Sequence, residues 1–191
     1  MMEFFIDTIS KTIQLTQADK EVFINNCLVT KLKKRQFFLQ EGNVCRYAGF
    51  VSKGCLKTYT IDKNGDEHVF QIALEGWWIS DMYSHLTGEP ANFTIEALED
   101  CEIVVMDIEA REKILKEVPG YERFHRILLE NNYMATQRRV NSMLSSSAEE
   151  RYLAFIKKYP QIVQRVPQLV IASYLGIAPE SLSRIRKQLA K

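Results

Sequence analysis

Two signals that would place a chain in or across a membrane are missing from this sequence. Its 191 residues contain no apolar run of 18 or more, so no membrane-spanning helix is predicted. The opening segment, MMEFFIDTIS, has no lysine or arginine and carries Glu3 and Asp7, which is not the pattern of a secretory signal. We therefore expect a cytoplasmic protein without a membrane partner.

Cysteine and histidine are scarce, and neither is clustered. The four cysteines form no C-x-x-C pair, so we expect reduced thiols, with neither a disulfide framework nor a zinc site. A metal-dependent enzyme of the cupin type, also built on a rolled β domain, needs clustered histidine and carboxylate ligands. That enzyme is an alternative, but we expect no catalytic activity, no metal and no cofactor. The residues concerned are Cys27, Cys45, Cys55, Cys101, His68, His85 and His125.

The charge of the chain is nearly balanced overall but unevenly distributed. The formal net charge is +1. Residues 151–191 hold eight Lys/Arg and one acidic residue, a net charge of +7, whereas the preceding residues hold 17 Lys/Arg and 23 Asp/Glu, a net charge of −6. A basic tail on an acidic body indicates a polyanionic partner for the tail, although a solvated basic face would give the same count.

Two helical segments precede a long β-rich stretch. Residues 4–15 have a helical apolar pattern, and Thr16-x-x-Asp19 matches a capping box that opens a second helix. From Val29 to Asp107, short segments rich in β-branched and aromatic residues predict strands. These segments are FFLQEG, YAGFVSKG, CLKTYTID, EHVFQIAL, FTIEAL and CEIVVMD.

Turn residues recur at regular intervals in the β-rich stretch. Asn64-Gly65 predicts a hairpin with a type I′ turn, in which both central residues have positive φ. Glycines at positions 42, 54, 65 and 76 are 11 or 12 residues apart. Regular spacing of this kind predicts a rolled or barrel-like antiparallel β domain.

A long helix is predicted from Pro119 to about Leu144, with the proline in its first turn. A helix of about 26 residues is about 39 Å long, more than a small β domain needs for cover. We expect it either to pack along its own β domain or to pair with a second copy. Ser146 and Ser147, three residues before Glu149 and Glu150, are alternative caps for the next helix, and the domain boundary is predicted at these serines.

The C-terminal segment, VIASYLGIAPESLSRIRKQLAK, has the pattern of a helix-turn-helix. Gly176 would supply the left-handed turn, and Pro179 is tolerated in the first turn of the second helix. Apolar residues recur before and after the glycine at the spacing of this motif, and Ile177, Leu182 and Ile185 among them would close a small core. The seven positions of the pattern are Ile171, Ala172, Leu175, Ile177, Leu182, Ile185 and Leu189.

The outer face of the second helix suits recognition of double-stranded DNA. Glu180 and Arg184, with Lys187 and Lys191, form one helical stripe. Glutamate can accept from cytosine N4, and arginine can donate twice to guanine. We expect base contacts from Pro179, Glu180 and Arg184, and phosphate contacts from Gln168, Ser181, Ser183 and Lys187. The alternative is a plain αα-hairpin with a charged outer face.

In this order, a β roll, a long helix and a helix-turn-helix resemble the Crp/Fnr family of transcription regulators. GWWISD (76–81), EALEDCEIVVMD and PESLSRIRKQL carry the resemblance. It implies an α+β fold with three parts: a jelly-roll effector domain (1–118) with flanking helices, a dimerisation helix and hinge (119–146), and a DNA-binding domain (147–191). It also implies a homodimer on a palindromic operator, a small-molecule effector, and RNA polymerase as a further partner.

The resemblance breaks down where the family holds cyclic nucleotides. Binders hold the ribose with the Glu of a Gly-Glu pair and the phosphate with an Arg. Those positions fall on Ser80-Asp81 and Ala91 here, and alanine offers a phosphate nothing. We therefore expect no tight binding of cyclic AMP or cyclic GMP. The candidate effector-pocket residues are Ser80, Asp81, Ala91, Asn92 and Thr136.

Other departures leave alternatives within the family open. Members usually continue past the recognition helix into a β wing, but this chain ends two residues after Leu189. We therefore expect fewer phosphate contacts and a shallower salt dependence. A redox or haem sensor is an alternative, although only Cys27 lies where iron–sulfur members cluster cysteines. An effector-free regulator is another alternative.

Overall fold

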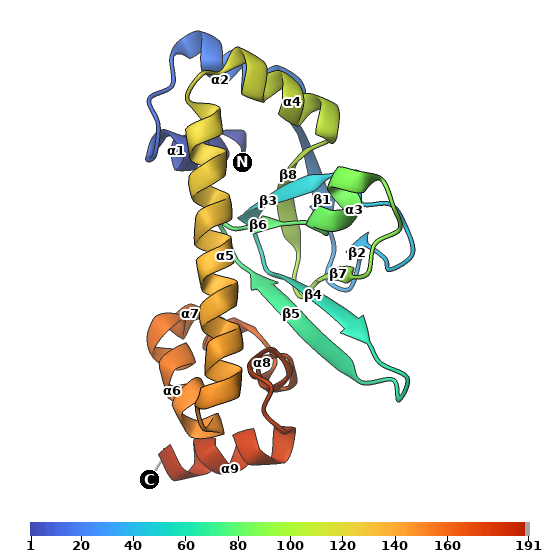
Figure 1. Cartoon of the computed structure of the whole chain (residues 1–191), viewed down its shortest axis with the longest axis vertical. Helices are drawn as coiled ribbons and strands as arrows, with labels where there is room; N and C mark the ends of the chain where they lie inside the picture. Colours follow the sequence, from blue (N-terminus) through green and yellow to red (C-terminus); the bar gives the residue numbers. More distant parts are fainter. Residues whose placement is uncertain (190–191) are drawn as a thin grey trace. The chain divides into compact units, whose positions relative to one another are not determined.

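The computed structural model describes residues 1–189, and the chain divides into two compact units (Figure 1). The first unit comprises residues 1–60 together with residues 71–129. The second comprises residues 61–70 and the chain from Glu130 onward. No helix in the described part is both long and apolar enough to cross a membrane. Lys191, which the sequence places on the recognition stripe, lies outside the described residues.

Eight strands in the described residues form two four-stranded sheets. The pairs β1–β8, β3–β8, β3–β6, β2–β7 and β4–β7 are antiparallel. The first sheet has the order β1-β8-β3-β6, and the second has the order β2-β7-β4-β5. The expected antiparallel β roll within an α+β fold is confirmed, as two open sheets. The strands are β1 (Leu28–Leu32), β2 (Phe37–Leu39), β3 (Ala48–Lys53), β4 (Leu56–Ile61), β5 (Glu67–Ala73), β6 (Trp78–Ile79), β7 (Thr94–Ala97) and β8 (Cys101–Met106).

Four helices flank these sheets: α1 (Met2–Ser10), α2 (Gln17–Asn26), α3 (Met82–Thr87) and α4 (Ile108–Glu117). The predicted capping box opens α2, because Thr16 accepts from the N–H of Asp19 and the Asp19 carboxylate accepts from that of Thr16. Asp107 caps α4 by accepting from the N–H of Ala110 at 2.8 Å. These caps satisfy amide groups that the first helical turn leaves without partners.

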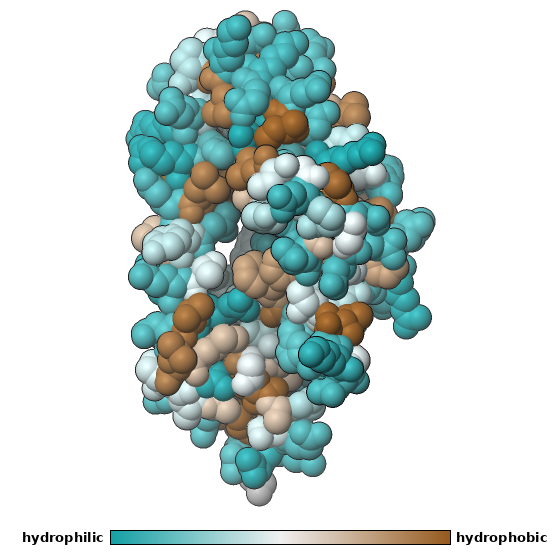
Figure 2. Space-filling view, turned by 45° about the vertical axis from the view of Figure 1, so that its right-hand side comes forward, coloured by the Kyte–Doolittle hydropathy of each residue, from teal (hydrophilic) through white to brown (hydrophobic). Residues whose placement is uncertain are grey.

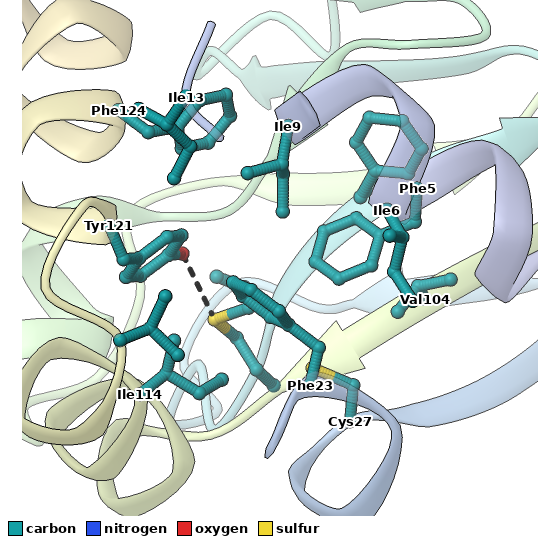
Figure 3. Packing of buried hydrophobic residues seen from close by; sticks show 14 residues of the cluster. Phe5, Ile6, Ile9, Ile13, Phe23, Cys27, Val104, Ile114, Tyr121 and Phe124 are labelled. Carbon is teal, nitrogen blue, oxygen red and sulfur yellow. Dashed lines mark hydrogen bonds between the residues drawn. The ribbon is translucent and has the colours of Figure 1, made fainter. Parts of the chain in front are cut away.

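The core beside the first sheet joins aromatic residues from separate segments (Figure 3). Phe5 of α1 and Phe23 of α2 meet edge to face, with their ring centroids 5.7 Å apart. Phe23 also contacts the ring of Tyr121, whose hydroxyl donates to the sulfur of Met106. Burial raises the pKa of the Tyr121 hydroxyl. These buried aromatic contacts hold the N-terminal helices α1 and α2 against Tyr121 and β8.

The predicted turn glycines are confirmed, but the predicted hairpin turn is wrong. Gly42, Gly54, Gly65 and Gly76 all have positive φ, the conformation in which glycine carries no Cβ penalty. Asn64 does not have positive φ, as a type I′ turn requires. Instead, the N–H of Gly65 donates to Asp62 O, and the N–H of Asp62 donates to Asp66 O. The hairpin therefore closes with a longer loop in which glycine alone is left-handed.

The long helix α5 covers Tyr121–Ser145. It begins two residues after Pro119, because a turn through Gly120 precedes it and the N–H of Tyr121 donates to Val118 O. The helices that follow are α6 (Ala148–Lys158), α7 (Pro160–Arg165), α8 (Gln168–Leu175) and α9 (Pro179–Leu189). Of the two candidate caps, Ser147 forms the capping box with Glu150, whose pKa is lowered by these hydrogen bonds.

Hydrophilic side chains cover most of the face seen in Figure 2, and hydrophobic groups are scattered among them in separate patches. Scattered apolar side chains are normal on a folded protein. No single patch on this face therefore identifies a binding site.

Candidate nucleic-acid interface

The turn between α8 and α9 has the predicted left-handed glycine. Gly176 has φ 62° and ψ 40°. Its N–H donates to Ser173 O at 3.1 Å, and the N–H of Ile177 donates to Ala172 O at 2.9 Å. This pair of bonds is the Schellman arrangement that ends a helix sharply. The chain can therefore enter α9 after only three residues.

The small core predicted around this turn forms, because Ile177, Leu182 and Ile185 are all buried. Ile171, at 0% exposure, and Leu182, at 1%, lie at its centre. Ala172 and Leu175 are buried as well. Leu189, the last apolar residue of the motif pattern, is 45% exposed and stands in the last turn of α9, where that helix runs beyond the packed residues.

Arg151 of α6 anchors the turn from the other side. Its Nε donates to Leu175 O at 2.9 Å, and a guanidinium Nη donates to Gly176 O at 3.1 Å. The other Nη donates to Ser146 O at 2.6 Å. From the sequence, Arg151 is only one more positive charge, because no local pattern indicates a side chain that bonds to residues 24 or 25 positions along the chain.

The predicted base-contact residues share the outer face of α9. Pro179, Glu180 and Arg184 are all exposed, and within residues 1–189 neither Glu180 nor Arg184 forms an ion pair with another side chain. Glu180 and Arg184 stand one helical turn apart. Both groups therefore remain available to hydrogen-bond acceptors and donors outside the chain.

The predicted phosphate contacts lie along α8 and α9. Ser183 and Lys187 are exposed, Ser181 is half-buried, and Gln168 is half-buried at the first residue of α8. No side chain caps α8, since Pro167 precedes it. The first N–H groups of α8 can therefore serve an anion. A groove of about 450 Å³ between the two helices is lined by Gln168, Leu169, Pro179, Leu182, Ser183, Arg186 and Lys187.

The hairpin formed by residues 61–70 packs on this unit through contacts that the sequence did not predict. The Ser173 hydroxyl donates to Glu67 O at 2.7 Å and accepts from the N–H of Val69 at 2.9 Å. Arg139 of α5 lies over the rings of both Phe70 and Tyr174. The single hydroxyl thus pairs with β5 as a neighbouring strand would, and fixes α8 beside the hairpin.

The candidate effector residues fall in both units. Ser80, Asp81, Ala91 and Asn92 come together around α3 in the first unit, whereas Thr136 is exposed on α5 in the second. Ala91 is 3% exposed, so its methyl group packs inside the unit. The Asp81 carboxylate is 2% exposed and accepts from two backbone N–H groups.

Neither the thiols nor the histidines form a reactive cluster. All four cysteines are free and buried, and burial raises the pKa of Cys27 to about 12, which leaves the unreactive thiol form. Burial lowers the pKa values of His85 and His125. In the described part of the chain, no three side chains of His, Cys, Asp or Glu converge as metal ligands would.

Comparison with known proteins agrees with this arrangement. The cyclic nucleotide-binding domain family matches residues 29–118. The chain is 23% identical to the fumarate and nitrate reduction regulatory protein of Vibrio cholerae, covering 84% of this chain and 68% of that protein. It is 24% identical to the regulatory protein HlyX of Actinobacillus pleuropneumoniae, covering 84% and 70% respectively.

Solved structures share the fold along nearly the whole chain. FixK2 from Bradyrhizobium japonicum has a TM-score of 0.73 at 17% identity, covering 86% of this chain and 84% of that one. The c-di-GMP-responsive regulator CLP of Xanthomonas campestris has a TM-score of 0.72 at 14% identity, covering 92% of each. With the antiparallel roll, the long helix and the helix-turn-helix in this order, the chain is similar in sequence and fold to transcription regulators of the Crp/Fnr family.

Proposed function

We propose that the chain binds double-stranded DNA in a sequence-specific manner, with α9 as the recognition helix in the major groove. The observation that carries this proposal is the unpaired polar face of α9, held at a fixed angle to α8 by the Gly176 turn. Glu180 and Arg184 would read base edges from it, with Pro179 beside them. The uncapped start of α8 and the groups at Ser181, Ser183 and Lys187 would contact phosphates.

The charge of the chain supports the same partner. The segment 151–191 carries a net charge of +7, and neutralised phosphates supply much of the affinity of a DNA-binding domain. The relatives named above are regulatory proteins, so they give no support for a catalytic role. We assign the protein to the cytoplasm, with promoter DNA as its main partner and RNA polymerase as a predicted second one.

A homodimer through α5 is the assembly that we propose. Leu129, Tyr133, Val140 and Leu144 follow one stripe of this helix, with Thr136 among them, and are 41%, 69%, 49% and 83% exposed. Apolar residues at spacings of four and seven are typical of a helix that pairs with another helix. A second copy would cover this stripe and present two recognition helices to a palindrome.

Tyr133→Arg is expected to weaken dimerisation by at least about tenfold, because it would bring two like charges together across the dimer axis. Sedimentation equilibrium would measure the change. Asn131→Arg is the matched control, since Asn131 is also exposed but lies on the opposite side of α5. If the two variants dimerise equally well, the stripe is not the interface.

Selection from random duplex DNA tests the proposed function as a whole. We expect the purified protein to enrich a palindrome with half-sites about one helical turn apart, ~34–36 Å. Enrichment of a single half-site would argue against binding to DNA as a dimer. A chain that shows no preference over random sequence, with and without extracts of small metabolites, would overturn the proposed DNA-binding function.

A further inference from the structure

The outer edge of β5 is bonded to side chains of α5 and α8. β5 is the last strand in the order β2-β7-β4-β5, so one of its edges pairs with no other strand of residues 1–189. On α8, the Ser173 hydroxyl donates to Glu67 O at 2.7 Å and accepts from the N–H of Val69 at 2.9 Å. On α5, the Arg139 guanidinium donates to Val69 O at 3.4 Å. Backbone groups on a strand edge need partners, and these two side chains supply them where a further strand would.

Arg139 also joins the hairpin of residues 61–70 directly to α8. Its Cζ atom lies 5.2 Å from the ring centre of Phe70 and 4.9 Å from that of Tyr174, and its guanidinium donates to Tyr174 O at 3.4 Å. A guanidinium is attracted to the faces of both rings. The hairpin, α8 and the part of α5 from Glu130 onward belong to one compact unit. Within that unit, one arginine therefore holds α5, the hairpin and α8 together.

The helices α6 to α9 are tied to α5 at two separate points. The first is the two-residue connection after Ser145, where Arg151 donates to Ser146 O at 2.6 Å. A single short connection would let these helices turn as a group about the end of α5. The second point is the contact of Ser173 and Arg139 with the hairpin. Because two separate points are held, the direction of α9 relative to α5 is fixed.

The direction of α9 relative to α5 decides which operators a dimer can bind. Arg139 directly precedes Val140, which belongs to the stripe through which we propose that α5 pairs with a second copy. Two recognition helices held rigidly to that interface meet two major grooves at one separation only. One added base pair moves the second half-site by ~3.4 Å and rotates it by about one tenth of a helical turn. A rigid dimer loses contacts on such a site, whereas a dimer with mobile recognition helices accommodates it.

We infer that Ser173 and Arg139 are positioning residues that restrict the dimer to operators with one separation between half-sites. The inference rests on the proposed function and specifies its DNA target more closely. The proposed base and phosphate contacts lie on α9 and at the start of α8, whereas the Ser173 hydroxyl is bonded to the hairpin. Ser173 and Arg139 therefore act on DNA recognition through the placement of α9.

Ser173→Ala is expected to relax the spacing preference without weakening base recognition. Fluorescence anisotropy compares three duplexes: the selected palindrome, the same palindrome with one base pair added between its half-sites, and a single half-site. Affinity for the selected palindrome should fall about three- to tenfold, because two hydrogen bonds that hold α8 in place are lost. Affinity for the single half-site should stay within about twofold, since it does not depend on where the second copy lies. The lengthened palindrome should be bound at least as tightly as by the unmodified protein.

Ser145→Ala is the matched control, because it also removes a serine hydroxyl of this unit, one that donates to Asn141 O of its own helix. Ser145→Ala and Ser173→Thr, which keeps the hydroxyl, should retain the spacing preference. Arg139→Gln should relax it as Ser173→Ala does, and it is judged by the same outcomes if Ser173→Ala does not fold. Equal losses of affinity for palindrome and half-site, or an unchanged spacing preference in both variants, would overturn the inference.

Failure of this inference and failure of the proposed function give different results. The unmodified protein tests the function alone, because an absence of sequence preference in DNA selection rejects it before any variant is compared. A palindrome that Ser173→Ala and Arg139→Gln bind with the spacing preference of the unmodified protein rejects only the positioning role.

Discussion

Arg184→Ala is expected to weaken binding to the selected operator by about 1–3 kcal/mol, roughly five- to 150-fold, and to relax the preference at one base position of each half-site. The guanidinium is exposed on the outer face of α9 and has no carboxylate partner in residues 1–189. Its planar fork matches the two acceptors of guanine. Because the side chain takes no part in the helix-turn-helix core, folding should be unchanged. Fluorescence anisotropy with the operator and with scrambled duplexes would measure both effects.

Lys187→Ala is the matched comparison on the same helix. Lysine acts on phosphate as a point charge, so its loss should weaken operator and scrambled DNA alike and reduce the salt slope by about one. The two variants remove equal charge. A base contact is therefore distinguished from a phosphate contact by whether affinity falls for the operator alone or for operator and scrambled DNA alike. If Arg184→Ala lowers the affinity for operator and scrambled DNA to the same extent, Arg184 contacts the DNA backbone, and its assignment as a base contact is wrong.

The parts of the fold that were predictable from sequence are those set by local chemistry. Thr16 caps α2 with the carboxylate three residues later, as predicted, and of the two candidate serines Ser147 caps α6 in the same way. Gly176 ends α8 because only a residue without a Cβ adopts its backbone angles cheaply. The apolar residues around it follow the helical period, and six of the seven residues of the predicted motif pattern are buried. Such features depend on neighbours within about one helical turn.

The parts that escaped prediction depend on segments far apart in the chain. Ser173 pairs with β5 across more than 100 residues, and Arg151 reaches the turn after α8. The sequence position of Asp81 predicts only a pocket residue. The two hydrogen bonds that its carboxylate accepts, from the N–H groups of Ser84 and Asn92, depend on the folding of separate segments and could not be predicted. The type I′ turn failed because Asn-Gly also suits a longer loop with one left-handed residue.

Gly54→Ala is expected to lower the free energy of unfolding of the first unit by about 2–6 kcal/mol. Gly54 has φ +100°, where a side chain brings backbone strain of about 1–3 kcal/mol. An added Cβ would also lie 2.5 Å from the sulfur of Cys101 and 2.7 Å from Asp100 O. Overpacking of this kind costs about 1–3 kcal/mol more, because Cys101 is buried and the carbonyl belongs to the backbone. Both tryptophans, Trp77 and Trp78, lie in this unit, so urea unfolding followed by their fluorescence reports on it.

Gly42→Ala separates the two contributions. Gly42 has a similar φ of +85°, but an added Cβ there would meet no atom within 4 Å. The free energy of unfolding of Gly42→Ala should therefore fall by the backbone strain alone, about 1–3 kcal/mol. The difference between the two variants measures the cost of the steric contact at Gly54. Equal losses would mean that the β3–β4 turn shifts away from Cys101 without cost. A larger loss at Gly54 would show that this glycine is required because the turn before β4 packs directly on the start of β8, so that a regularly spaced glycine marks tertiary packing as well as a change of chain direction.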